Sequence, residues 1–322
     1  MRAVIIGCGA IGAHIAYSLY EYGFHISILT QKYSYNKIIA NGLNIQINNN
    51  KKLIIKKRLK KNKKFEIHKS IKTINKKNDY IFITVKLKDF DTNLINNIKE
   101  ISNENTAIIP PCTNIPLWWI NRFYPKDVDL HKINYFNLEN IIGMTMWLSS
   151  VKLDYSTILV KHVQRGYPLK AINKKMKEKE SILREAFKKN GKSPKIKNIY
   201  SEIFSKSLNA LAFNMVALYF QQTNSEIQKN KSAIKMLEKI MIEGEKITNK
   251  LKLKLYQDYK QRIKQTLSSS IHTMSMLNDY QNGKKIELQY LWDSFSLLTK
   301  ISSIKMPYTK KIYSNLRKKY IN

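Results

Sequence analysis

Three glycines near the amino end of the chain have a spacing that could bind a dinucleotide. Gly7, Gly9 and Gly12 read G-x-G-x-x-G, after an apolar run at residues 3–6 and before a stretch of helical periodicity. In that context the first glycine permits a tight turn, the second lets the backbone approach a pyrophosphate, and the third packs the helix closely on a sheet. The alternative is a glycine turn in an α/β fold without a cofactor. We predict a cofactor loop made of Gly7, Cys8, Gly9, Ala10, Ile11 and Gly12.

The residues after the next apolar strand indicate which dinucleotide would bind. NAD sites usually carry an Asp or Glu at the end of this strand, where it accepts hydrogen bonds from the ribose 2′-hydroxyl. Here the strand at residues 25–29 is followed by Thr30, Gln31 and Lys32, with no carboxylate. A cation with hydroxyl and amide donors suits a 2′-phosphate, so we predict NADP(H). The alternative is that Lys32 is one of many solvated lysines.

A lysine in an apolar helix is the best candidate for a proton donor. Lys206 lies within the largely apolar stretch 201–214, and Asn214 follows on the same stretch. At about 100° per residue, Asn214 lies within roughly 80° of Lys206 and some 12 Å along the axis. Burial lowers the pKa of a lysine, which can then donate a proton near neutrality to a reduced carbonyl. The alternative is a lysine that reaches from a core helix to water.

The sequence shows no motif for metal binding, nucleophilic catalysis or P-loop nucleotide binding. The six histidines and two cysteines lack metal-ligand spacing, and the chain contains neither a G-x-S-x-G elbow nor a Walker A loop. Hydride transfer needs neither a metal nor a nucleophile, because a nicotinamide carries the reaction. We therefore predict no metal site.

The elements that would position these residues are typical of an α/β fold. An apolar run at residues 80–85 predicts a buried parallel strand, and Lys86 follows at the end where open sheets bind ligands. A hairpin is expected at residues 43–55, a helix at 92–101 and a strand at 106–109. We predict a Rossmann-type doubly wound sheet over residues 1–192.

The rest of the chain has helical periodicity almost throughout. Residues 191–194 are the best candidate linker, so we predict an all-α domain over residues 193–322. Its expected helices cover residues 199–221, a segment capped by Ser232, and residues 258–277, 286–300 and 309–320.

The composition indicates a globular, two-domain protein in a reducing compartment. The 322 residues are 43% hydrophobic, and Cys8 and Cys112 provide no disulfide framework, which favours the cytoplasm. The longest strongly apolar helical stretch, 208–220, is too short to span a bilayer, so we predict no membrane partner. The sequence leaves the oligomeric state open, a homodimer included.

The net charge of +34 comes from lysines spread along the whole chain. The densest run, residues 56–64, lacks the interleaved aromatic residues on which bases stack. We interpret it as a solvated loop between strands and predict no specific nucleic-acid partner. A positive field would still attract an anionic cofactor and substrate.

Several motifs in order along the chain resemble the ketopantoate reductase family. They are the amino-terminal GCGAIG, Val85-Lys86 after the strand, and the Glu-x-x-x-Lys start of the helix that contains Lys206. Further on, Ser275 and Glu287 stand twelve residues apart, followed by Lys-Met-Pro at 305–307. The glycine loop is shared with many dehydrogenases, whereas the order Lys206, Ser275 and Glu287 is more specific.

The resemblance implies a role for each matching residue. Lys206 would be the general acid, with Glu287 beside it and beside the substrate hydroxyl. Ser275 would bind the substrate carboxylate, Asn214 would contact substrate, and Lys86 would lie near the cofactor. Taken singly, Glu287 could instead cap a helix start and Ser275 could be a small packing residue.

The chain departs from the family pattern at three places. Ala210 occupies the position of a usual asparagine, with Asn209 one step away. Thr113 and Asn114 replace an Asn-Gly pair, and either could orient the nicotinamide or the substrate acid. His272 replaces a polar amide.

The resemblance therefore implies NADPH-dependent reduction of 2-dehydropantoate (ketopantoate) to pantoate, in the route to pantothenate. One alternative is a reductase of another branched 2-oxo acid on the same scaffold. A second is a non-catalytic, basic protein that binds NADP or nucleic acid.

Overall fold

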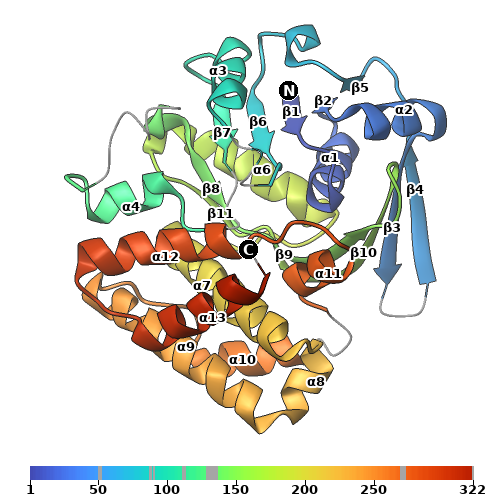
Figure 1. The fold of residues 1–322 in the computed structure, drawn as a ribbon. Coiled ribbons are helices and arrows are strands. Elements are labelled where there is room, and N and C mark those ends of the chain that lie inside the picture. Colours follow the sequence, from blue (N-terminus) through green and yellow to red (C-terminus); the bar gives the residue numbers. More distant parts are fainter. Residues whose placement is uncertain are drawn as a thin grey trace. The chain divides into compact units, whose positions relative to one another are not determined.

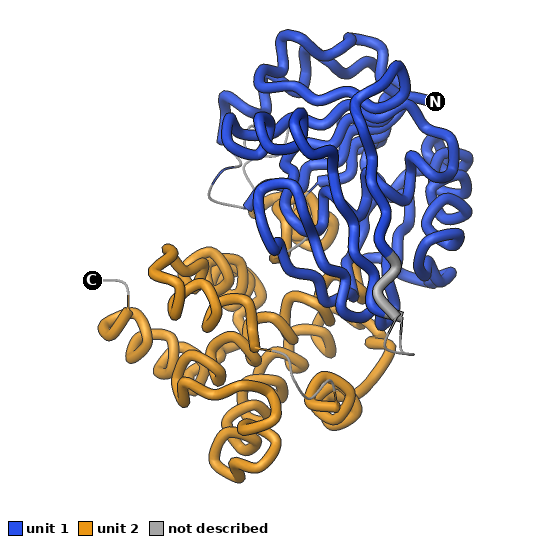
Figure 2. Tube along the Cα trace, turned by 90° about the vertical axis from the view of Figure 1, so that its right-hand side faces the viewer, with its two compact units in different colours: residues 1–112, 130–199 blue, residues 113–129, 200–322 orange. Residues whose placement is uncertain are grey.

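The computed structural model forms two compact units, coloured separately in Figure 2. Unit 1 comprises residues 1–112 and 130–199, and unit 2 comprises residues 113–129 and 200–322. The structure describes residues 1–49, 53–86, 89, 91–110, 114–127, 137–268 and 273–320. The sequence placed the division at residue 192, and it did not assign residues 113–129 to the helical part.

Unit 1 contains a parallel five-stranded sheet (Figure 1). The strand order is β5-β2-β1-β6-β7, and every neighbouring pair is parallel. The strands are β1 (Arg2–Ile6), β2 (His25–Leu29), β5 (Phe65–His68), β6 (Tyr80–Ile83) and β7 (Ala107–Ile109). The α-helices among the described residues of this unit are α1 (Ala10–Tyr22), α2 (Lys32–Asn41), α3 (Thr92–Glu100) and α6 (Lys177–Lys189). Short 3₁₀ turns cover Ile71–Thr73, Leu138–Asn140 and Lys174–Met176.

Both faces of this sheet are buried, as the alternation along β1 shows. Ala3 and Ile5 belong to one apolar cluster, which also contains residues of α1 and α6. Val4 and Ile6 belong to a second cluster, which contains Ile98 of α3. Successive strand residues point to opposite faces, so helices cover the sheet on both sides. The predicted Rossmann-type doubly wound sheet is confirmed.

A second sheet in unit 1 has the order β4-β3-β10-β9. Its strands are β3 (Leu43–Asn49), β4 (Leu53–Leu59), β9 (Trp147–Lys152) and β10 (Thr157–Gly166), and β8 (Ile142–Met144) pairs separately with β11 (Leu169–Ala171). The predicted hairpin is present as β3 and β4. The interpretation of residues 56–64 as a loop is wrong in its first part, because residues 56–59 continue β4.

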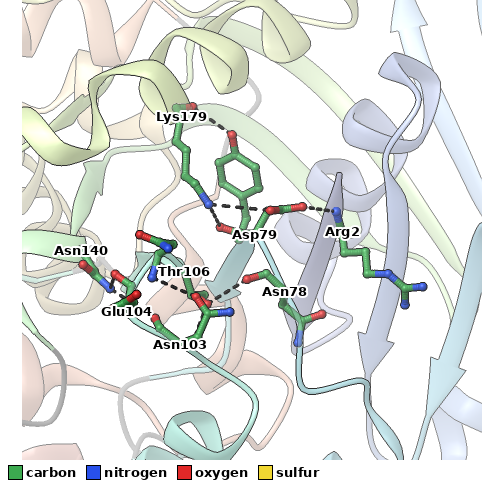
Figure 3. Close-up of polar contacts among 10 residues, drawn as sticks. Arg2, Asn78, Asp79, Asn103, Glu104, Thr106, Asn140 and Lys179 are labelled. Atoms are coloured by element: carbon green, nitrogen blue, oxygen red, sulfur yellow. Dashed lines mark hydrogen bonds and ion pairs between the residues drawn. The ribbon is translucent and has the colours of Figure 1, made fainter.

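Polar contacts close the amino end of the five-stranded sheet (Figure 3). The backbone N–H of Arg2 donates to Asp79 Oδ2 at 2.8 Å, and Lys179 Nζ of α6 donates to the Asp79 carbonyl oxygen at 3.0 Å. The Thr106 hydroxyl donates to the Asn78 carbonyl oxygen at 2.8 Å. In open parallel sheets ligands bind at the opposite end, where the carboxyl ends of the strands lie.

Unit 2 is helical in all its described elements. It contains α4 (Leu117–Phe123), α7 (Ile199–Phe220), α8 (Asn224–Lys229), α9 (Lys231–Lys250), α10 (Tyr259–Leu267), α11 (Ser275–Gln281), α12 (Leu288–Ser302) and α13 (Pro307–Tyr320). A Cβ atom on Gly244 of α9 would lie 2.3 Å from Leu208 Cδ1 of α7, so this glycine lets the two helices approach closely. The predicted all-α carboxyl-terminal part is confirmed.

The cap of one helix and the extent of another differ from the sequence prediction, apart from shifts of one or two residues at other helix ends. Asn230, and not Ser232, caps α9, because its side chain accepts hydrogen bonds from the N–H groups of Ser232 and Ala233. The helix expected over residues 258–277 is two helices, since α10 ends at Leu267 and α11 begins at Ser275.

Helix α7 is longer than the apolar stretch singled out in the sequence. Among the described residues it is the one helix with the length and composition to cross a bilayer, but 78% of its most apolar window is buried inside the protein. The core helix of a folded unit has the same length and composition, so this helix alone is not evidence of a membrane span.

Candidate active site

The glycine loop joins β1 to α1 and is held from both sides. Gly7 has a φ of +100°, which favours glycine, and its N–H donates to the Leu29 carbonyl oxygen at 2.9 Å. The Thr84 hydroxyl donates to the carbonyl oxygen of Gly7 at 2.7 Å. A Cβ atom on Gly12 would lie 2.1 Å from that same oxygen and 2.5 Å from Thr84 Oγ1. The first and third glycines are therefore required by the fold itself.

Gly9 is different, because the fold gives no reason for a glycine there. Its φ of −78° and ψ of −174° are open to any residue, and no described atom lies within 4 Å of the position of an added Cβ. It precedes α1, whose first turn, described in full, contains no acidic residue, and no side chain caps it. Open space beside free N–H groups at a helix start suits a pyrophosphate. The loop therefore fits the dinucleotide predicted from its spacing.

The remaining loop residues add no charge. Ala10 and Ile11 are half-buried and begin α1. Cys8 is buried, and burial raises the pKa of its thiol to about 12, although the Lys152 ammonium acts in the opposite direction. A protonated thiol at neutral pH neither repels an anion nor acts as a nucleophile.

The end of β2 carries the predicted set of residues without a carboxylate. Lys32 is exposed and is the first residue of α2, whose described first turn contains no acidic residue. Lys86 is also exposed and follows the end of β6 at Ile83. Both lysines thus come after the carboxyl ends of strands in the parallel sheet, which is the ligand-binding end of such sheets.

Lys206 lies in the middle of the 22-residue helix α7 of unit 2. Its side chain is half-buried, and its sequence neighbours Ser205 and Ser207 are buried. Burial lowers the pKa of its ammonium group from the ordinary 10.5 to about 8. The lysine therefore stays protonated at neutral pH, but holds its proton far less tightly than a solvated lysine. A group of this kind can act as a general acid.

Asn214, on the same helix, is brought together with the start of α11. Its Oδ1 accepts a hydrogen bond from the Met276 N–H at 3.1 Å, and its Nδ2 donates to the Ala210 carbonyl oxygen at 2.7 Å. Ser275, the first residue of α11, is exposed. Asn214 therefore holds α11, the helix that begins with Ser275, the residue predicted to bind the substrate carboxylate. Contact of Asn214 or Ser275 with substrate stays a prediction.

Asn114 is tied to the helix that follows Glu287. Its Nδ2 donates to the Tyr290 carbonyl oxygen, and its Oδ1 accepts hydrogen bonds from the Ser294 hydroxyl and from the Ile115 N–H. Glu287 is half-buried and stands directly before α12. Asn114 thus fixes the segment before α4 to the first turns of α12. Thr113 and His272 lie outside the described residues.

Asn209 does not take the place of the family's asparagine, which is Ala210 in this chain. Asn209 Nδ2 donates to the Thr266 hydroxyl of α10 at 3.2 Å, and Asn209 is buried. Its amide therefore serves the packing of α7 against α10. Ala210 contributes only its carbonyl oxygen, which accepts the hydrogen bond from Asn214.

The sequence analysis did not identify two residues that hold the candidate site residues in place, Thr84 and Ser294. Thr84 fastens the glycine loop, and a polar residue directly after a buried strand was the available signal. Ser294 binds Asn114 across 180 positions, and nothing local in the sequence indicates that pair. Among the described residues no group of three His, Cys, Asp or Glu side chains could hold a metal ion, so the structure offers no candidate for one there.

Comparison with protein-family models gives two matches. Residues 3–111 match the model described as Ketopantoate reductase PanE/ApbA, and residues 198–320 match Ketopantoate reductase PanE/ApbA C terminal. Together the two models cover most of the chain.

Individual relatives are distant but extend over the full length. A 2-dehydropantoate 2-reductase of Mesorhizobium japonicum is 22% identical over 306 residues, which is 90% of this chain and 89% of that protein. The crystal structure of 2-dehydropantoate 2-reductase from Geobacter metallireducens is similar with a TM-score of 0.80 at 17% identity, covering 99% and 100% of the two chains. The ternary structure of D-mandelate dehydrogenase with NADH and anilino(oxo)acetate also has a TM-score of 0.80 at 17% identity, covering 100% and 99%. At these identities the structural matches show a shared fold.

Proposed function

Because this chain belongs to the ketopantoate reductase family, and so is an oxidoreductase that acts on CH–OH groups, we propose that it reduces 2-dehydropantoate to pantoate with NADPH. The product would enter pantothenate biosynthesis, and the low cysteine content supports a cytoplasmic location. Membership of a family of oxidoreductases favours this function over the non-catalytic alternative that the charge of the chain had suggested.

The glycine loop would hold the pyrophosphate of the cofactor. Gly9 leaves room for it, and the first N–H groups of α1 would donate to its oxygens. Lys32 would bind the 2′-phosphate, since no carboxylate of the first turn of α2, which is described in full, would repel it. Lys86 would lie near the cofactor. A bound nicotinamide supplies the hydride that reduces the carbonyl carbon.

Lys206 would supply the proton. As the carbonyl carbon gains a hydride, its oxygen becomes an alkoxide, and the ammonium of Lys206 donates a proton to that oxygen. Solvent then returns a proton to the neutral amine, so that the 2-oxo acid, NADPH and one proton give the 2-hydroxy acid and NADP⁺. The half-buried position of Lys206 and its pKa of about 8 are the observation that carries the proposal.

Three other residues would handle the substrate. Ser275 would donate to its carboxylate, Glu287 would steady the ammonium and the substrate hydroxyl, and Asn214 would contact substrate while it holds α11. Asn114 or Thr113 would orient the nicotinamide or the acid. Asn114 would do so mainly through the backbone that its side chain fixes.

The test is NADPH oxidation with 2-dehydropantoate by the wild type and by Lys206→Ala. Removal of a general acid typically lowers kcat by about 10²–10⁴-fold. If the alanine variant kept its kcat within a few-fold, Lys206 would not be the acid.

A related 2-oxo acid is the second candidate substrate. Ala210 in place of the family's asparagine, with Asn209 committed to Thr266, leaves the polar lining of α7 different from the family pattern. The D-mandelate dehydrogenase with the same fold was solved with anilino(oxo)acetate, which is a different 2-oxo acid derivative. A panel of branched and aromatic 2-oxo acids, compared by kcat/KM, would distinguish the two candidates.

A further inference from the structure

A lysine of the second sheet lies beside the start of α2, although it is far from it in sequence. Lys152 is the last residue of β9, and its Nζ donates to the hydroxyl of Ser34 at 2.9 Å. Ser34 is buried in the first turn of α2, two residues after Lys32. The two lysines are therefore brought to one end of α2 by different parts of unit 1.

Lys152 also lies beside a pair of exposed aromatic rings. Its Nζ lies 5.0 Å from the centroid of the Tyr155 ring, and that ring lies 5.8 Å from the ring of Tyr33 in α2. Tyr155 belongs to the turn between β9 and β10. The turn is itself held by Asp154, whose Oδ1 accepts hydrogen bonds from the Ser156 N–H and hydroxyl and from the Thr157 N–H. One oxygen of this carboxylate is thus committed to the turn.

Lys152 is exposed, and the strand register places it on the face of its sheet that carries two buried isoleucines. Lys152 is opposite Ile158, and Ile158 is opposite Ile45. Both isoleucines are buried in the cluster that also contains Cys8 of the glycine loop. The charge of the Lys152 ammonium lowers the pKa of the Cys8 thiol in that loop, against the larger effect of burial.

Lys152 thus lies beside the first turn of α2, and its charge acts on a residue of the glycine loop. In folds of this type the pyrophosphate binds at that loop, and the adenosine ribose hydroxyls face the end of the second strand. A cation at the first turn of α2, which follows that strand, would be near the 2′-oxygen of the ribose. Phosphate at that oxygen carries about −1.5 to −2 charge, and lysine binds it as a point charge.

We propose that Lys152 is a cofactor-specificity residue that binds the 2′-phosphate of NADP(H) together with Lys32. The inference rests on the proposed function, which supplies the NADP preference, and adds a residue to it that comes from outside the parallel sheet. It requires no contribution from unit 2.

The test uses binding and needs no turnover. Titration calorimetry would give the Kd of 2′,5′-ADP and of 5′-ADP. Each probe carries two phosphates, but the second phosphate is on the ribose 2′-oxygen in the first probe and on the 5′-phosphate in the other. Lys152→Met should weaken binding of 2′,5′-ADP at least about tenfold, or 1.4 kcal/mol, and that of 5′-ADP less than about twofold. Lys152→Arg should retain most of the wild-type preference.

Lys56→Met is the matched control. Lys56 is an exposed lysine of β4, opposite Gln46, which is opposite Leu159. Since Leu159 pairs with Val151, the neighbour of Lys152, Lys56 lies on the other face of the same sheet. Both variants lose one charge, so an equal small effect of the two would mean that the general positive field is responsible, and would overturn the proposal.

Ser34→Ala separates charge from packing. It removes the hydrogen bond to Lys152 but keeps the ammonium, and should keep most of the preference for 2′,5′-ADP. If Ser34→Ala lost the preference as fully as Lys152→Met, the lysine would act by packing and the proposal would be wrong. Circular dichroism and the thermal midpoint would establish that each variant is folded.

Failure of this inference differs from failure of the proposed function. Suppose that the wild type prefers 2′,5′-ADP and reduces 2-dehydropantoate, and that Lys152→Met keeps this preference. Then only the proposed role of Lys152 is wrong. If the wild type binds NADPH no more tightly than NADH, the NADP preference and the role of Lys152 are both wrong, and substrate reduction is still tested by its own assay.

Discussion

The Oδ1 atom of Asn214 accepts a hydrogen bond from the backbone N–H of Met276, at 3.1 Å. This one contact joins α7, which carries Lys206, to α11, which begins at Ser275. Two residues with separate proposed roles, one for the proton and one for the substrate carboxylate, are therefore on helices that a third residue holds together.

Replacing Asn214 should affect substrate binding more than chemistry. Asn214→Ala leaves the Met276 N–H without its acceptor, which costs about 1–3 kcal/mol for a buried group. We expect a lower free energy of unfolding in urea and a raised KM for the 2-oxo acid. Asn214→Asp keeps an acceptor for Met276 and is the control. A wild-type KM in the alanine variant would mean that α11 is held by other contacts.

The activity should fall at alkaline pH. Only the protonated form of Lys206 can donate a proton, and burial sets its pKa at about 8. In the pH profile of kcat, the rate should therefore decline as the pH rises through this region, provided that chemistry limits the rate. Isotope effects with deuterated NADPH would establish that condition. A profile that stays flat to pH 10 would contradict the assignment.

The ionisation of Lys206 should also affect stability: its contribution to the free energy of unfolding should rise with pH, whereas kcat should fall. Burial lowers the pKa of Lys206 in the folded state, whereas the unfolded chain keeps the ordinary value of 10.5. Between about pH 8 and 10.5 the unfolded state therefore binds more protons, and the contribution of this group to the free energy of unfolding rises with pH. Lys206→Met should lack that rise. Urea denaturation of both proteins at pH 7.5 and 9.5 measures the difference.

Substitutions at Gly12 and at Gly9 of the glycine loop should differ in their effect on stability. In Gly12→Ala the new Cβ would overlap the Gly7 carbonyl oxygen, and we expect a loss of more than about 2 kcal/mol in unfolding free energy, which exceeds the gain of about 1 kcal/mol in helix propensity. In Gly9→Ala the Cβ meets no described atom within 4 Å, so stability should change by less than about 1 kcal/mol.

The Gly9→Ala variant should instead bind NADPH poorly, because its methyl group occupies space left for the cofactor. Fluorescence titration with NADPH would measure the Kd, and we expect an increase of at least about tenfold, or 1.4 kcal/mol. A variant that is stable and binds NADPH normally would show that the pyrophosphate does not approach this residue.

A carboxylate at the end of β2 should shift the cofactor preference. In Lys32→Glu, the new side chain would repel a 2′-phosphate and accept hydrogen bonds from a 2′-hydroxyl. The ratio of kcat/KM for NADPH to that for NADH should fall at least about tenfold, or 1.4 kcal/mol. Lys37→Glu, in the same helix, gives the same change of charge away from its first turn. Equal effects of the two variants would point to net charge alone.

Local patterns in the sequence were enough for the cofactor loop and the sheet that carries it. Gly7, Gly9 and Gly12 lie within six residues of one another, and the apolar run at 80–85 gives β6 directly. These features depend on neighbouring residues, so periodicity and spacing could identify them.

Contacts between distant residues could not be predicted in the same way. Asn114 binds Ser294 and Trp119 Nε1 donates to the Tyr200 carbonyl oxygen, and these pairs put residues 113–129 in the helical unit. The position of Lys152 beside Ser34 likewise depends on how β10 pairs with β3 and β9. No local pattern specifies such pairings, because they depend on which distant segments pack together.

The assignment of residues 113–129 to unit 2 means that no single peptide bond separates the two units. Trp119 is fully buried and packs on Phe204 of α7, yet its segment is synthesised before the second half of unit 1. A nascent chain that ends before Ile199 therefore carries this tryptophan without the aromatic residues that later enclose it. A fragment that starts at residue 193 lacks the tryptophan altogether, so neither half of the gene encodes a complete helical unit.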